Sequence, residues 1–381
     1  MLKISSVHCI FITNVKSEVH FLDILYLINF AGKAGTEKYV SNLVHILSAR
    51  GENCHLAYNI PGQLSETLES EGFPCLRLDM SGRNALGAAR RLAAYCREHR
   101  IEVIHAQYPR ENIIALLSKL FYRRVKVVYT SHLTIHQNAK WKLLNRIFTP
   151  FNHRIIAVCR QGADILASNG VKKDRIRVIY NGVSPSGKRV YDRSFARSFG
   201  IPDNTFVMSI MARYAPEKGL PFLLASLAKL RRKTDRPFVC FIAGDGEEFD
   251  DFAVMCQNSG MNDRVIQLGF RTDSAEMLKS SDLYLNSSSK NEAMSFAILE
   301  AMNAGVPLVV TDVGGNRDLA ETHTVCGKVI PFGDSNGFSD AILELMENKT
   351  LLKEYSDSAL RKVREEFDLE KLALDVFNAY N

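Results

Sequence analysis

Short apolar runs alternate with amphipathic stretches along most of this chain. In the first half, the runs that predict strands are residues 24–30, 53–59, 73–79, 102–107, 126–132, 154–159 and 176–182. They are rich in β-branched and aromatic residues, and the stretches 36–51, 85–100 and 111–123 between them have helical patterns. This alternation predicts a parallel sheet covered by helices on both faces.

The pattern stops near Asn181-Gly182-Val183 and then starts again. Further strands are predicted at 206–214, 238–246, 264–270, 283–289, 306–315 and 328–333, with helices such as 219–233 between them. The last stretch, 358–380, is helical and no strand follows it. We therefore predict an α/β protein of two doubly wound, Rossmann-like domains that face a central cleft, residues 24–184 and 185–362. Residues 1–23 are predicted as an N-terminal extension, and 363–381 as a helix that packs back on the N-terminal domain.

Composition excludes several classes of protein. A hydrophobic content of 46% over 381 residues excludes a disordered chain. The eight cysteines are scattered without a C-x-x-C pair, so neither a disulfide framework nor a zinc site is indicated, and a reducing compartment is favoured. The sequence shows no signal peptide and no run of about 18 apolar residues. We expect a cytoplasmic protein.

Charge divides the chain into unlike halves. Residues 1–190 hold 27 Lys and Arg against 13 Asp and Glu, whereas the whole chain has a net charge of only +6. Residues 81–160 alone hold 15 basic and 3 acidic residues, and the stretch 139–154 interleaves basic with aromatic side chains. Such a half attracts an anionic partner: nucleic acid, an anionic membrane surface or a phosphorylated substrate. Solvated charge and an ordinary amphipathic helix are the alternatives.

Glu292 and Glu300 are the most informative pair, because they flank a predicted helix start near Ser295 and Phe296. Eight helical residues span about 12 Å, which roughly matches the distance from the sugar of a nucleotide sugar to its ribose. Free N–H groups at the helix start would suit the diphosphate between them. Glutamates this far apart also occur on ordinary helix surfaces.

Two cations follow a strand of the second half. Arg213 and Lys218 lie in Ala-Arg-Tyr-Ala-Pro-Glu-Lys-Gly and would suit a diphosphate leaving group, or belong to a solvated surface turn. Gly32 and Gly35 in the first half either let a backbone approach a ligand or make a plain turn.

His132 ends the strand 126–132, at the sheet edge where ligands bind, and either donates to a sugar or phosphate or is structural. No D-x-D pair follows a strand, so the sequence does not indicate a metal that holds a diphosphate. Positive side chains would have to replace it.

Together these residues resemble the retaining glycosyltransferases of family 4, which have the GT-B fold. The resemblance covers about residues 24–381 and is most specific at ARYAPEKG and at LNSSSKNEAMSFAILEAMNAGVPLVVTDVGG, an E-x7-E signature followed by a Gly-Gly turn. The sequence departs from the family at Ala293-Met294-Ser295, at Ser184 and at Asp318, which leaves the donor sugar open.

The resemblance implies a role for each matching position. Arg213 and Lys218 would hold the donor diphosphate, Glu300 the ribose, and Glu292 would lie beside the transferring sugar. Gly35 would approach the diphosphate, and His132 would contact the sugar from the N-terminal domain. The backbone of Met294, Ser295 and Phe296 would contact the sugar or the phosphate. The base would lie near Gly269, Phe270 and Arg271.

The resemblance therefore predicts a metal-independent transferase that moves a sugar from a UDP- or GDP-sugar to a sugar or lipid-linked acceptor. Its N-terminal domain would bind the acceptor and its C-terminal domain the nucleotide sugar, in cell-surface polysaccharide or glycolipid assembly. We expect an anionic membrane surface as a partner and no nucleic acid. A nucleotide-sugar epimerase on the same scaffold and a non-catalytic protein that binds anions or nucleic acid are the alternatives.

Overall fold

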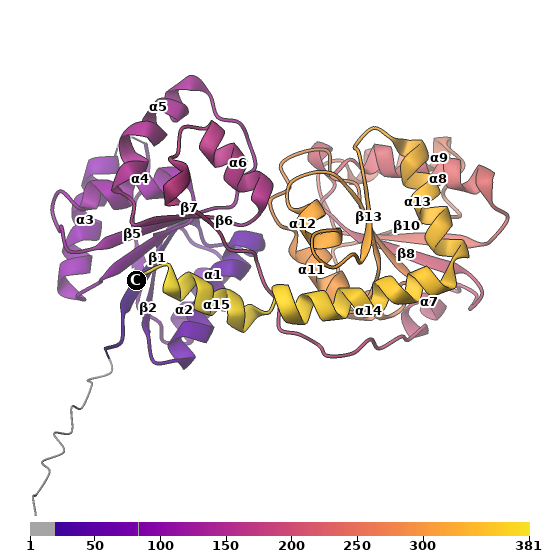
Figure 1. The fold of residues 1–381 in the computed structure, drawn as a ribbon, viewed down its shortest axis with the longest axis horizontal. Helices are drawn as coiled ribbons and strands as arrows, with labels where there is room; N and C mark the ends of the chain where they lie inside the picture. The colour runs from indigo at the N-terminus through magenta and orange to yellow at the C-terminus, as the bar shows by residue number, and fades with distance from the viewer. Residues whose placement is uncertain (1–19, 83) are drawn as a thin grey trace, which may run out of the picture.

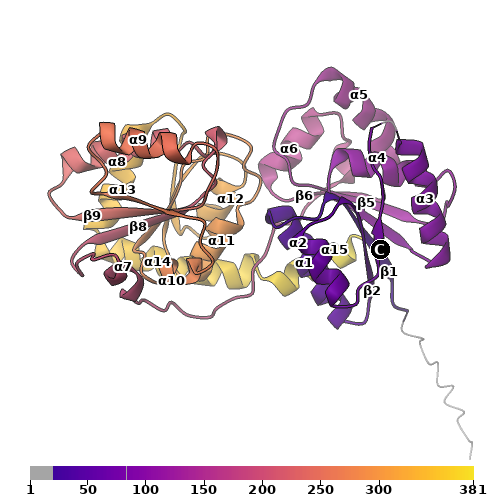
Figure 2. The ribbon, with the colours of Figure 1, turned by 180° about the vertical axis from the view of Figure 1, so that it is seen from behind.

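The computed structural model describes residues 20–82 and 84–381, so most of the predicted N-terminal extension lies outside the described residues. Within them the chain forms two parallel sheets, each covered by helices on both faces (Figures 1 and 2). The first sheet has the strand order β3-β2-β1-β4-β5-β6-β7, and the second the order β10-β9-β8-β11-β12-β13. Each predicted strand overlaps one of these strands, which confirms the predicted fold class.

The strands of the first sheet are β1 (Asp23–Phe30), β2 (Asn53–Ile60), β3 (Cys75–Arg77), β4 (Val103–Ala106), β5 (Lys126–Ser131), β6 (Arg154–Ala157) and β7 (Ile176–Val178). Its helices are α1 (Gly35–Ala49), α2 (Gln63–Ser70), α3 (Ala85–Glu98), α4 (Pro109–Ser118), α5 (Ala139–Phe148) and α6 (Arg160–Ser168). Successive residues of β1 face opposite sides of the sheet, because a strand has a period of two. Tyr26 packs in the core under α1 and α2, whereas Leu25 packs in the core under α3 and α4.

The strands of the second sheet are β8 (Phe206–Met211), β9 (Phe238–Ala243), β10 (Val265–Gly269), β11 (Leu283–Asn286), β12 (Leu308–Thr311) and β13 (Gly327–Ile330). Its helices are α7 (Ser194–Ser198), α8 (Leu220–Lys233), α9 (Phe249–Asn258), α10 (Ser274–Lys279), α11 (Phe296–Asn303), α12 (Asn316–Ala320), α13 (Ser335–Glu347) and α14 (Lys349–Glu366). Short 3₁₀ turns lie at Thr149–Phe151, Lys173–Arg175 and Pro216–Lys218.

The chain crosses between the two sheets twice, and the two crossings are bonded to each other. The Val183 N–H donates to the Phe367 carbonyl at 2.9 Å, and the Leu369 N–H donates to the Val183 carbonyl at 3.1 Å. At this point the predicted helical stretch 358–380 divides into α14 and α15 (Leu369–Asn378), because Asp368 caps the second helix by accepting from the Glu370 N–H. The predicted boundary at 184 falls just after the first crossing and that at 362 falls inside α14; both stay predictions.

Helix α15 lies on the first sheet, beside α1, although it follows the second sheet in the chain (Figures 1 and 2). Tyr380 just after it is completely buried, and its hydroxyl lies 2.8 Å from Nδ1 of the buried His105. The other ring nitrogen of His105 lies 2.7 Å from the Thr130 hydroxyl. The core of the first sheet is thus completed by residues that follow the second sheet in the chain.

Candidate active site in the cleft between the two sheets

Glu292 is fixed in the loop between β11 and α11. Its carboxylate accepts from Lys218 Nζ and from the Ser288 hydroxyl, both at 2.7 Å, and the residue is only 7% exposed. The Thr134 hydroxyl of the first domain donates to the Glu292 backbone carbonyl at 2.8 Å. Lys218 and Glu292 were predicted from separate motifs, and the structure brings them together as one partly buried ion pair.

The loop that carries Glu292 rests on the Gly314-Gly315 turn. A Cβ added to Gly314 would lie 1.5 Å from the Glu292 carbonyl oxygen, and the Gly315 N–H donates to the Ala293 carbonyl at 2.7 Å. Gly314 also has a φ of +62°, a left-handed conformation that favours glycine. The Gln161 side chain of the first domain accepts from the Gly314 N–H at 2.6 Å. The sequence singled out the Gly-Gly turn, but only the structure shows that it supports Glu292.

The start of α11 lies directly beyond Glu292. Ser295 caps the helix by accepting from the Ile298 N–H, and the remaining N–H groups of the first turn have no partner within the helix. The Met294 carbonyl accepts from the Asn181 side chain at 3.2 Å, so it is bonded to the segment that crosses between the two domains. Phe296 packs against the cores of both domains, and its ring faces Gly35, where an added Cβ would lie in ordinary contact at 3.4 Å.

A cavity of about 440 Å³ opens beside α11 at the carboxyl ends of β8, β9 and β10. Of the predicted site residues, Arg213, Phe270, Arg271 and Glu300 line it. Arg213 is exposed and pairs with Glu217, while Arg271 pairs with Asp273. The Phe270 ring is 56% exposed, so an aromatic face is available at the cavity wall.

Gly269 sets the direction of the chain into that wall. It ends β10 with a φ of +67°, and its carbonyl accepts from the Gly244 N–H at 2.8 Å. The predicted base site at residues 269–271 is therefore a turn at a strand end, next to the loop after β9.

His132 lies at the carboxyl end of β5, as predicted, but it does not line this cavity. Its Nε2 lies 2.9 Å from the Gln107 side-chain oxygen, and its ring meets the Tyr39 ring edge-on at 4.9 Å between centroids. Burial lowers the pKa of His132 to about 3, so the ring is neutral near pH 7.

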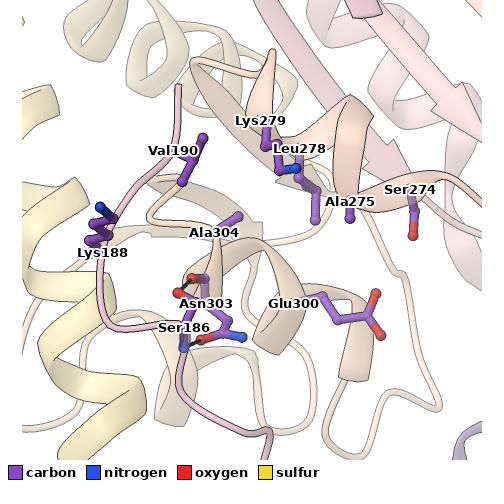
Figure 3. A pocket seen from close by; sticks show the side chains of 10 residues that line it. All are labelled: Ser186, Lys188, Val190, Ser274, Ala275, Leu278, Lys279, Glu300, Asn303 and Ala304. Atoms are coloured by element: carbon purple, nitrogen blue, oxygen red, sulfur yellow. Dashed lines mark hydrogen bonds between the residues drawn. The ribbon is translucent and has the colours of Figure 1, made fainter. Parts of the chain in front are cut away.

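Glu300 also borders a second cavity, of about 350 Å³. This cavity lies between the interdomain crossing, α10 and α11, and is lined by Ser186, Lys188, Val190, Ser274, Ala275, Leu278, Lys279, Glu300, Asn303 and Ala304 (Figure 3). The Glu300 carboxylate points away from Ser186 and Asn303, which bond to each other (Figure 3). Ser274 and Glu300 line both cavities.

Two lysines of the first domain, which the sequence did not single out, reach the same wall. Lys38 Nζ lies 2.5 Å from the Glu300 carboxylate, and Lys33 Nζ lies 4.3 Å from the centre of the Phe270 ring. Lys33 lies in the Gly-rich loop after β1 and Lys38 in the first turn of α1, where the sequence alone indicates ordinary surface cations. Their partners are more than 200 residues away in the chain.

Two family models match most of the chain. The model of Glycosyltransferase Family 4 matches residues 34–186, and that of Glycosyl transferases group 1 matches residues 192–362. Among curated relatives, N-acetyl-alpha-D-glucosaminyl L-malate synthase from Bacillus anthracis is 26% identical over 304 residues, 75% of this chain and 76% of that protein.

The UDP-Gal:alpha-D-GlcNAc-diphosphoundecaprenol alpha-1,3-galactosyltransferase of Escherichia coli is 25% identical over 271 residues, 67% of this chain and 69% of that protein. Among solved structures, Anabaena Alr3699/HepE in complex with UDP superposes with a TM-score of 0.84 at 20% identity, over 94% of this chain and 99% of that one. This likeness shows that the two sheets and their helices form the GT-B fold.

Proposed function

Since this chain carries the two domains of a GT-B glycosyltransferase, one of family 4 and one of group 1, we propose a retaining enzyme that uses a UDP- or GDP-sugar and no metal ion. The observation that carries the proposal is the Lys218–Glu292 pair, held at the start of α11 with Glu300 farther along the same helix. A cation and a carboxylate thus lie just before the start of α11, and a second carboxylate lies on the helix itself.

This arrangement suits the departure of a diphosphate. The bond between the anomeric carbon and the diphosphate oxygen breaks, and negative charge grows on the leaving group. Lys218, Arg213 and the N–H groups of α11 offset that charge, and fixed groups of this kind supply a large part of catalysis. The cations would thereby do what a divalent ion does in other transferases.

Retention follows if the leaving phosphate also accepts the proton of the acceptor hydroxyl. The new bond then forms on the face from which the diphosphate departs, and the products are a glycoside and a nucleoside diphosphate. No side chain has to act as nucleophile. Glu292, held by Lys218 and Ser288, orients the sugar and stabilises positive charge at its anomeric carbon.

We assign the nucleoside to the cavity between β8, β9, β10 and α11. The Glu300 carboxylate would accept from the ribose hydroxyls, and the exposed Phe270 face would meet the base beside Gly269 and Arg271. Gly35 would let the first domain approach the diphosphate, and Ser295, Phe296 and the Met294 N–H would lie at the sugar or phosphate. His132 would contact the sugar from the first domain.

The acceptor is proposed as a sugar or a lipid-linked sugar, in polysaccharide or glycolipid assembly. The name of the E. coli relative describes a lipid-linked diphosphate acceptor, which supports this class. The protein would then work in the cytoplasm, against the inner face of the membrane. Within residues 20–82 and 84–381, no helix has the length and hydrophobicity to cross a bilayer.

An exposed face on α5 supports contact with an anionic membrane surface. None of the residues of α5 is buried, and its apolar side chains Leu143 and Ile147 are 57% and 51% exposed. Phe151 just beyond it is 66% exposed, and Lys142 and Arg146 lie among these side chains in the sequence. A helix of this kind inserts its apolar side chains at a membrane interface while its cations meet anionic headgroups.

Release of nucleoside diphosphate tests the proposal. Thermal-shift screening against UDP- and GDP-sugars finds the donor, since a ligand at 100-fold its Kd adds about 2.7 kcal/mol to the free energy of unfolding. Incubation with that donor and sugar or lipid-linked acceptors should give an α-configured product from an α-configured donor, with full activity in chelator. An inverted product, or loss of activity in chelator, would overturn the mechanism. Conversion of the donor sugar without any acceptor would identify an epimerase instead.

A further inference from the structure

Two lysines of the first domain cover the groups that we assign to the nucleoside. Lys33 Nζ lies 4.3 Å from the centre of the Phe270 ring, within the range of a cation–π contact. Lys38 Nζ lies 2.5 Å from the Glu300 carboxylate and 5.3 Å from the centre of the Phe296 ring. A base on Phe270 and a ribose on Glu300 would therefore have to displace one lysine each.

The backbone holds both lysines at this place. They flank Gly35, where α1 begins, and Gly35 faces the Phe296 ring at the start of α11. Both helices begin beside the cavity that we assign to the nucleoside, and Lys33 is the one first-domain residue among the described side chains that line it. Both lysines are exposed, so a change in either side chain should alter the cleft rather than the buried core of either domain.

We infer that Lys33 and Lys38 make the cleft selective for nucleoside diphosphates over nucleosides, by covering the nucleoside contacts when the cleft is empty and turning to the diphosphate when it is occupied. This inference rests on the proposed function and names its determinants of ligand selection.

The selectivity follows from what the displaced lysines gain. A nucleoside is neutral, so it breaks the contacts of Lys33 with Phe270 and of Lys38 with Glu300 and offers neither lysine an anionic partner. A nucleoside diphosphate breaks the same contacts but brings phosphate oxygens, which form charge-assisted hydrogen bonds with ammonium groups. The two lysines thus weaken binding of the first ligand and strengthen binding of the second.

Isothermal titration calorimetry with four probes, UDP, uridine, GDP and guanosine, tests whether the affinities for nucleoside and diphosphate change in opposite directions. In the double variant Lys33→Ala/Lys38→Ala, the matching nucleoside should bind about two- to fivefold more tightly, because an exposed ion pair and a cation–π contact no longer compete with it. The matching diphosphate should bind more weakly, on the order of tenfold at low salt, because two charge-assisted contacts are lost.

Three further variants make the result specific. Lys38→Met keeps an aliphatic stem over Phe296 and should shift both affinities in the same directions as the alanine variant. Lys38→Arg keeps the charge and should leave the order of affinities unchanged. Lys349→Ala removes an exposed lysine at the start of α14, away from the cleft, and should change neither affinity.

If the two lysines had only a structural role, their removal would not change the two affinities in opposite directions. If nucleoside and diphosphate both weakened, or neither changed, Lys33 and Lys38 would have no part in ligand selection, although the proposed function would stand. If the unaltered protein bound neither UDP nor GDP, the proposed function would fail and this inference with it.

Discussion

Replacement of Gly314 by alanine should disable the cleft by displacing Glu292. The added Cβ would lie 1.5 Å from the Glu292 carbonyl oxygen and 2.5 Å from its carbonyl carbon, both of them backbone atoms. Non-bonded atoms keep about 3 Å or more apart, so the two backbones must separate by roughly 1.5 Å. That movement would break the Lys218–Glu292 contact or weaken it, together with the bond from Thr134.

The expected loss can be estimated from two separate effects. Alanine in a left-handed conformation costs about 1–2 kcal/mol of stability. Misplacement of a catalytic group by about 1 Å costs on the order of 100-fold in rate. We expect Gly314→Ala to lower turnover at least about 100-fold while the protein remains folded.

Gly260→Ala is a matched control. Gly260 has a φ of +67°, close to the +62° of Gly314, but no atom lies within 4 Å of its added Cβ. The control should therefore show the cost in stability and keep its turnover within a few-fold. Both variants are compared by urea unfolding and by release of nucleoside diphosphate. Equal turnover in the two variants would refute the idea that Gly314 supports Glu292.

Three further outcomes follow from the same contacts. Lys218→Ala leaves the buried Glu292 carboxylate with Ser288 as its remaining side-chain partner, so the free energy of unfolding in urea should fall by about 1–3 kcal/mol. An unchanged free energy of unfolding would mean that the Lys218–Glu292 pair is not formed. Burial lowers the pKa of both His105 and His132 to about 3; below about pH 6.5 each binds a proton in the unfolded chain but not in the native one. The free energy of unfolding should therefore fall by about 1.4 kcal/mol per pH unit and per histidine as the pH drops from about 6 toward 4. His132→Asn should make this pH dependence shallower, and an unaltered slope would contradict the lowered pKa of His132. Ile147→Ser/Phe151→Ser should reduce sedimentation with anionic vesicles and leave the melting temperature nearly unchanged, and Val254→Ser on α9 is a control at an exposed apolar residue. Equal binding of the unaltered protein to neutral and anionic vesicles would refute the contact with an anionic membrane.

Local patterns predicted the fold well, because a doubly wound sheet repeats one strongly patterned unit. β1 is a run of apolar residues buried on both faces, and α1 shows one apolar face that includes Leu43 and Leu47. The break between α14 and α15 was not predicted, although Asp368 is a common capping residue. The helical periodicity on either side of Asp368 concealed the two non-helical residues between the helices.

The site was predictable where one motif holds one group, and not where two domains meet. Ser295 was placed at a helix start and is the cap of α11. The pairing of Lys38 with Glu300 joins residues 262 positions apart, and only the placement of the two domains brings them together. His132 was placed correctly at a strand end, but its partner Gln107 directly follows the neighbouring strand β4, and periodicity does not reveal such a bond.

The return of α15 to the first sheet has a consequence for synthesis of the protein. Tyr26 and His105 are made early, yet the Tyr380 hydroxyl that meets His105 is added only after the whole second sheet has been translated. Until then the first domain emerges from the ribosome with an apolar groove beside α1 that no other described part of the chain fills. Nascent chains paused before residue 369 should consequently be bound by chaperones and cut by protease in the first domain, even when the second domain is already folded.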